Sequence, residues 1–164
     1  MKNIVLIGLM GCGKTTIASL LSKELNLPLI DMDNYIEKIN NEKISDIFKT
    51  KGEKYFRDEE TKACKEIGKL DSYIISTGGG VPLRKENIDY LKNNSIIIYI
   101  NRPVENILND VTINDRPLLS DGASKLYDLY TIRNPIYKDA CNIEILNDSS
   151  LQDIVKKIKE IDLK

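Results

Sequence analysis

Gly8-Leu9-Met10-Gly11-Cys12-Gly13-Lys14-Thr15 is the stretch that decides the fold of this chain. It matches G-x-x-x-x-G-K-[ST], with the apolar run 3–7 before it and a helical pattern from Thr16 to Leu25 after it. The glycines allow the backbone to wrap a phosphate chain with its N–H groups inward, at the positive end of a helix. We therefore expect Lys14 to reach the β- and γ-phosphates of a nucleotide and the Thr15 hydroxyl to bind Mg²⁺. A glycine-rich turn with an incidental lysine is disfavoured, because every fixed position of the motif is filled in order.

Length and composition predict one globular domain spanning residues 1–164. The contents of 41% apolar and 30% charged residues are those of a soluble protein. A net charge of −1 does not favour a nucleic-acid partner, and no apolar run has the length of a membrane span. Cys12, Cys64 and Cys141 form no C-x-x-C pair and no disulfide framework, so we expect a cytoplasmic location.

Histidine is absent from the chain, which excludes Ser-His-Asp catalysis, Cys-His catalysis and histidine-ligated zinc. Arginine is scarce, since only five of the 24 basic residues are arginine. An arginine kept in so lysine-rich a chain suggests a need for planar, bidentate binding of an anion.

The hydrophobic pattern predicts five strands that alternate with helices, and hence a parallel sheet in a three-layer α/β/α domain. The expected strands are 3–7, 29–30, 73–77, 96–100 and 142–146. The expected helices are 16–25, two short ones within 35–49 and longer ones at 53–67, 104–108, 125–132 and 150–161. Residues 109–122 have turn formers, charges and little periodicity, which is typical of a mobile lid over an active site.

Asp31 and Asp33 follow the second strand, and ligands of open α/β sheets bind beyond the carboxyl ends of strands. We expect Asp31 to hold Mg²⁺ through water, and Asp33 to accept a hydrogen bond or a proton from a substrate hydroxyl. The alternative is that Asp33 only caps a helix that begins at Asn34.

Two further features are open to more than one interpretation. Arg57 and Glu60 are three residues apart on one helical face, and the sequence by itself favours an exposed salt bridge of little energetic value. Gly78-Gly79-Gly80 follows the third strand, where glycines permit close approach of the backbone to a ligand, although a flexible turn is the alternative.

Taken together, these motifs make the chain resemble the shikimate kinase family over essentially its full length. The resemblance rests on the phosphate loop, Asp31-Met32-Asp33, Phe56-Arg57 with Glu60, the triple glycine, Arg116-Pro117-Leu118-Leu119, and Arg133 followed by Pro135 and Tyr137. It implies a P-loop kinase fold with sheet order 2-3-1-4-5, a monomer, and ATP- and Mg²⁺-dependent phosphorylation of the 3-hydroxyl of shikimate.

By the same resemblance, residues 33–66 form the substrate-binding helices, and Asp33, Arg57, Gly79 and Arg133 bind shikimate. Gly11, Cys12, Gly13, Lys14, Thr15 and Thr16 bind ATP, and Arg116 is a lid arginine that folds onto the phosphates. The catalytic residues are then Lys14, Asp33 and Arg116, and the metal residues are Thr15 and Asp31.

The chain departs from the family near the nucleotide base. An arginine that often stands at the start of the lid is replaced by Leu108-Asn109-Asp110, and no arginine follows Arg133. Lys125 or Lys138 would compensate only weakly. The alternative functions are a gluconate-type sugar-acid kinase and a non-catalytic nucleotide-binding relative.

Overall fold

The structure is a computed structural model that describes residues 1–114 and 121–161, with side chains described for residues 1–110 and 122–161. Within these ranges, no helix is long and apolar enough to cross a membrane.

One parallel sheet organises the chain, with strand order β2-β3-β1-β4-β5. This confirms both the predicted strand number and the predicted order. The strands are β1 (Asn3–Ile7), β2 (Leu29–Asp31), β3 (Ile74–Ser76), β4 (Ser95–Asn101) and β5 (Ile143–Leu146). Because all five run in the same direction, the segments that follow them meet at one edge of the sheet.

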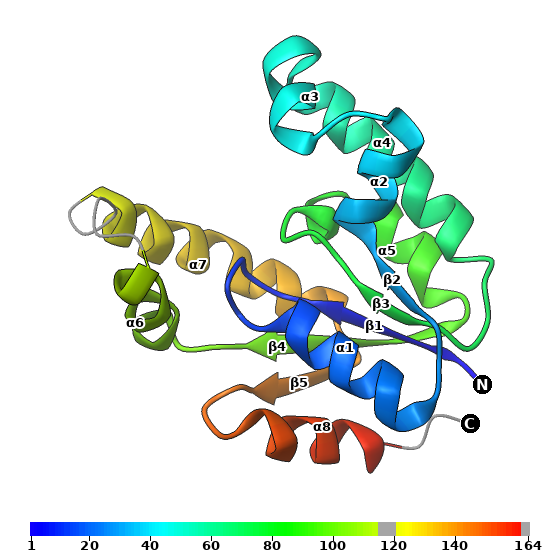
Figure 1. Cartoon of the computed structure of the whole chain (residues 1–164), viewed down its shortest axis with the longest axis vertical. Helices are drawn as coiled ribbons and strands as arrows, with labels where there is room; N and C mark the ends of the chain where they lie inside the picture. The colour runs from blue at the N-terminus through cyan, green and yellow to red at the C-terminus, as the bar shows by residue number, and fades with distance from the viewer. Residues whose placement is uncertain (115–120, 162–164) are drawn as a thin grey trace.

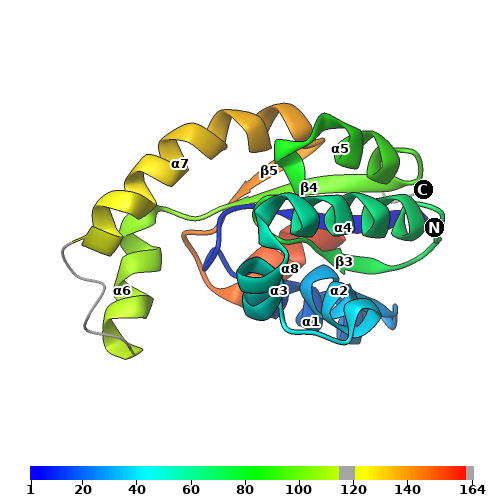
Figure 2. The ribbon, with the colours of Figure 1, turned by 90° about the horizontal axis from the view of Figure 1, so that it is seen from above.

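Helices cover both faces of the sheet, as Figure 2 shows. On one face lie α1 (Lys14–Leu25) and α8 (Leu151–Lys159), and on the other lie α4 (Gly52–Ile67), α5 (Lys85–Lys92) and α7 (Asp121–Ala140). The central strand β1 explains this arrangement, because its alternate side chains point to opposite faces. Ile4 and Leu6 pack into the core under α1 and α8, whereas Val5 and Ile7 pack into the core on the other side.

The remaining elements lie beyond the carboxyl ends of the strands. They are α2 (Met32–Asn40), α3 (Ile44–Thr50), the short 3₁₀ helix η1 (Val81–Leu83) and α6 (Val104–Asn114). In Figure 1, α3 and the outer parts of α6 and α7 extend past the sheet on two different sides. Helices α2, α3 and α4 form the region 33–66 that was expected to bind substrate.

Three segments differ from the sequence-based prediction. Helix α5 was not predicted, although Ile88 and Leu91 on it are buried between charged neighbours. Helix α6 continues through Asn114, and so enters the range 109–122 that was predicted to be a lid. Helix α7 was expected to end at Ile132 but runs through Pro135, and the loss of one backbone hydrogen bond there is offset by burial of Tyr137 and Ala140.

Candidate active site

The phosphate loop lies between β1 and α1, and the N-terminus of α1 is suited to binding an anion. Gly13 is the N-cap of α1, no side chain caps the helix, and no acidic residue lies in its first turn. The first N–H groups of the helix therefore lack the partners that a capping side chain would provide. Gly13 has φ 98°, and a methyl group there would lie 3.1 Å from Asn147 Nδ2, so the loop needs glycine at this position.

Two side chains brace the loop from outside. Asn147 Nδ2 donates to the Cys12 carbonyl at 2.9 Å, and Arg102 Nη1 donates to the Gly11 carbonyl at 3.1 Å. Binding these carbonyls on the outside favours inward-pointing N–H groups, the arrangement that binds phosphate. The motifs assign no role to Arg102 or Asn147, and the available signal was that each directly follows a strand, β4 or β5.

Lys14 lies folded across the loop that it follows. Its ammonium group donates to the Gly8 carbonyl at 2.8 Å and to the Leu9 carbonyl at 3.0 Å, and the residue is 8% exposed. The position puts a positive charge at the mouth of the loop, beside the free end of α1.

Asp31 lies beside Thr15 and caps helix α2. The Thr15 hydroxyl donates to Asp31 Oδ2 at 3.4 Å, and Asp31 Oδ1 accepts from the Asn34 backbone N–H at 3.1 Å. The alternative in which Asp33 is the cap is therefore wrong, since Asp33 lies inside the first turn of α2. The Asp33 carboxylate is thus available to the site.

The Asp33 side chain is exposed, but enough protein surrounds it to shift the pKa of its carboxyl group. Partial burial raises the pKa of its carboxyl group, and the nearby Asp31 carboxylate raises it further. The charges of Lys14 and Arg57 act in the opposite direction. The residue thus lies where the phosphate loop and the arginine of α4 both influence it.

Arg57 and Glu60 form a partly buried ion pair, which corrects the expectation of an exposed salt bridge. Arg57 Nη1 lies 2.6 Å from Glu60 Oε2, and the two side chains are 16% and 1% exposed. Burial raises the pKa of the Glu60 carboxyl group, while the Arg57 guanidinium acts to lower it. The sequence could not show this burial, because it arises from the packing of α4 against the glycine turn.

The triple glycine makes room for the side chains of the site. A methyl group at Gly78 would lie 2.9 Å from Asp33 Oδ1, and one at Gly80 would lie 2.6 Å from Arg57 Cζ. A methyl group at Gly79 would lie 3.4 Å from Arg133 Nη1. The protein's own acidic and basic groups therefore approach this turn closely, while the predicted approach of its backbone to a ligand stays a prediction.

Arg133 reaches the same place from α7, so three segments that are distant in sequence bring Asp33, Arg57 and Arg133 to the glycine turn. Lys14 lies nearby, as its effect on the Asp33 pKa indicates. Arg116 and the central part of the expected lid lie outside the described residues.

A cavity of about 290 Å³ lies on the other side of the phosphate loop. Its walls include Thr16, Arg102, Asn106, Asp110 and Asn147. Arg102 Nη2 lies 2.6 Å from Asp110 Oδ2, so the guanidinium is held from two sides.

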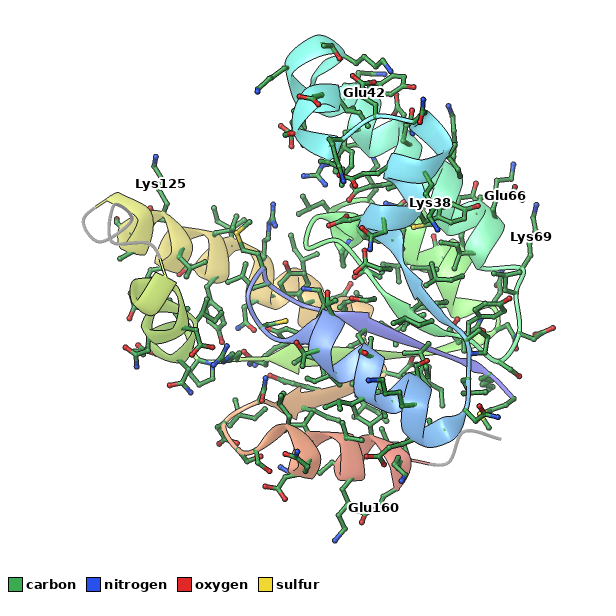
Figure 3. All side chains as sticks on the ribbon, in the orientation of Figure 1. Lys38, Glu42, Glu66, Lys69, Lys125 and Glu160 are labelled. Atoms are coloured by element: carbon green, nitrogen blue, oxygen red, sulfur yellow. The ribbon has the colours of Figure 1, made fainter. Side chains whose placement is uncertain are left out.

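The lysines considered as substitutes for a missing arginine do not line this cavity. Lys125 projects from the outer end of α7, away from the sheet (Figure 3). Lys138 Nζ lies 3.7 Å from Glu144 Oε2.

Comparisons with known proteins agree with this geometry. The family model described as shikimate kinase matches residues 10–162. A shikimate kinase of Clostridium beijerinckii is 50% identical over 162 residues, covering 98% of this chain and 95% of its own. One from Clostridium botulinum strain Alaska E43 is 48% identical and covers 98% of both chains. The structure of a shikimate kinase from Acinetobacter baumannii in complex with shikimate has a TM-score of 0.88 and 34% identity, with 98% of this chain and 92% of that chain covered.

Proposed function

This chain belongs to the shikimate kinase family, and we propose that it transfers the γ-phosphoryl group of ATP to the 3-hydroxyl group of shikimate. The observation that carries the proposal is the convergence of Asp33, Arg57 and Arg133 on the glycine turn beside a phosphate loop. A hydroxy acid needs cationic groups for its carboxylate and an acceptor for its hydroxyls, and this set supplies both.

On the donor side, residues Gly11 to Thr16 cradle the phosphates with the backbone N–H groups of the loop and of the α1 start. Lys14 exchanges its hydrogen bonds with the Gly8 and Leu9 carbonyls for bonds to phosphate oxygens. Because phosphoryl transfer leaves little covalent chemistry to the protein, this positive charge contributes mainly by stabilising the transition state.

The oxygen atoms of Thr15 and Asp31 fit a Mg²⁺ site. Oxygen ligands are what Mg²⁺ prefers, and it commonly uses one or two protein ligands together with water and the phosphates of the nucleotide. When bound, Mg²⁺ would neutralise charge on the phosphates.

On the acceptor side, Arg57 and Arg133 bind the shikimate carboxylate, with Gly79 supplying backbone contacts. Glu60 holds the Arg57 guanidinium in place at 2.6 Å. Asp33 accepts a hydrogen bond from the attacking hydroxyl and receives its proton, a task that its raised pKa assists.

The cavity beside the loop takes the nucleotide base. It adjoins Gly13 and Thr16, and Arg102 offers a planar cationic surface that Asp110 and the Gly11 carbonyl hold still. Arg102 would then bind adenine in this chain, which lacks the usual lid arginine.

Three parts of the proposal rest on the sequence and on family resemblance. Arg116 folds onto the phosphates when the lid closes, which also excludes water as a competing nucleophile. The protein acts as a monomer in the cytoplasm. The free thiols of Cys12, Cys64 and Cys141 fit a reducing compartment.

The test is coupled measurement of ADP release from purified protein with ATP and Mg²⁺, in parallel reactions with shikimate, gluconate, quinate, AMP or no acceptor. We expect stimulation by shikimate alone. Stimulation by gluconate would instead favour the sugar-acid kinase and reassign Arg57, Gly79 and Arg133. No stimulation by any acceptor would favour a non-catalytic nucleotide-binding protein.

A further inference from the structure

Tyr137 has a buried hydroxyl group to which the proposed function assigns no task. The residue is 1% exposed, and its Oη donates to the Gly79 carbonyl at 2.7 Å. Burial raises the pKa of the phenol, although Arg133 opposes the shift, so the group keeps the proton that this hydrogen bond requires.

The Gly79 carbonyl lies where three parts of the active site meet. A methyl group at Gly79 would lie 3.5 Å from the Gly8 carbonyl oxygen, 3.6 Å from the Met10 nitrogen and 3.4 Å from Arg133 Nη1. The phosphate loop, α7 and the glycine turn therefore lie close together around this residue. A group that fixes Gly79 also fixes the acceptor site relative to the phosphate donor.

The orientation of one peptide plane follows from the Tyr137 bond. The Gly79–Gly80 peptide is trans, so the Gly79 C=O and the Gly80 N–H point in opposite directions. Holding the carbonyl toward α7 therefore directs the Gly80 N–H away from α7. Within the described part of the chain, neither the Gly79 N–H nor the Gly80 N–H donates to another group.

Two cations lie close to the residues that carry these N–H groups. Arg57 crowds Gly80, and Arg133 lies beside Gly79. Adjacent backbone N–H groups with basic side chains around them can form a site for an anion, and under the proposed function this anion is the carboxylate of the acceptor. The hydrogen bond from Tyr137 thus acts on acceptor binding through the backbone.

Tyr137 itself is held firmly. Its ring packs against that of Tyr99 with centroids 5.1 Å apart, and Tyr99 Oη donates to Asn134 Oδ1 at 2.9 Å. Tyr137 follows Arg133 by four residues, so the two side chains leave α7 on the same face. Helix α7 therefore carries both the Arg133 cation that binds the acceptor and the Tyr137 hydroxyl that donates to the glycine turn.

We propose that Tyr137 is a positioning residue for the acceptor, because its hydroxyl orients the Gly79–Gly80 peptide for binding of the carboxylate. The inference rests on the proposed function. Tyr137→Phe removes the donor, leaves the ring in place and leaves a carbonyl without its partner. We expect KM for shikimate to rise on the order of tenfold, with KM for ATP changed by less than about twofold.

The matched control is Tyr99→Phe, which also removes a buried phenol hydrogen bond from the same cluster but does not touch Gly79. Both variants are expected to lower Tm by similar amounts, and only Tyr137→Phe is expected to raise KM for the acceptor. This difference separates positioning from a general loosening of the core.

Each outcome bears on the proposal. An unchanged KM for shikimate in Tyr137→Phe, or an equal rise in Tyr99→Phe, would overturn the inference while leaving the proposed function intact. If another hydroxy acid stimulates the unmodified protein, the same two variants are compared with that acid, and the same pattern is expected. If no acid stimulates it, the proposed function fails and the inference fails with it.

Discussion

Replacement of Gly80 by alanine tests whether the glycine turn exists to admit Arg57. Gly80 has φ −93° and ψ −6°, which alanine adopts without strain, so the backbone does not oppose the change. The added methyl group would lie 2.6 Å from Arg57 Cζ, whereas ordinary contacts begin at about 3.4 Å. Arg57 Nη1 would lie closer still, so the guanidinium must withdraw by more than 0.8 Å, the difference between those two distances.

The size of the effect follows from what Arg57 loses. Such a shift breaks the geometry of its bond to Glu60 at 2.6 Å and of any contact with the acceptor carboxylate. Hydrogen bonds to charged groups contribute about 1.5–3 kcal/mol, so we expect KM for shikimate to rise by about 10- to 150-fold. Gly→Ala at a permitted conformation restricts the unfolded chain and adds about 0.4–1 kcal/mol of stability, but displacement of Arg57 from the buried Glu60 carboxylate acts in the opposite direction. Thermal unfolding therefore checks that the variant remains folded.

The assay is ADP release with shikimate and ATP titrated separately, together with thermal unfolding. A double-mutant cycle provides the control, because Gly80→Ala should add little to the effect of Arg57→Ala once the colliding side chain is gone. A normal KM for shikimate in Gly80→Ala would refute the steric reasoning. Additive effects in the double variant would place the cause elsewhere than in contact with Arg57.

Three further predictions concern charged groups of the site. Lys14→Met should leave a folded protein with kcat lowered on the order of 10²- to 10³-fold, and near-normal turnover would contradict its assignment to the phosphates. Arg133→Ala should raise KM for shikimate much more than KM for ATP, whereas equal changes would place Arg133 outside the acceptor site. The kcat/KM for shikimate should fall as pH drops through the Asp33 pKa, which burial and Asp31 raise above 3.8, because protonation removes the base. An activity that is retained in Asp33→Asn with an unchanged pH profile would rule out this role.

Local sequence determined much of this protein. The phosphate loop between an apolar run and a helical pattern predicted β1 and α1, since the glycine positions and the Lys14-Thr15 pair have few other uses. The alternation of strands and helices predicted the parallel sheet. Asp31 and Asp33 were placed at its carboxyl edge because every parallel strand ends there. These conclusions depend on residues that are close together in the chain.

Tertiary structure decided what depends on distant residues. The glycine turn determines how deeply Arg57 and Glu60 are buried. It follows them by about twenty residues, and because it has no side chains it leaves space for theirs. Asn147 and Arg102 bind the outside of the phosphate loop only because β4 and β5 pack on the same side of β1 in the sheet. In the same way, Tyr137 reaches the Gly79 carbonyl only because α7 packs against the sheet. Helix α7 passes through Pro135 for the same reason, because the core contacts of Tyr137 outweigh a local preference. Spacing along the chain predicts elements and motifs, whereas burial and long-range hydrogen bonds depend on which elements become neighbours.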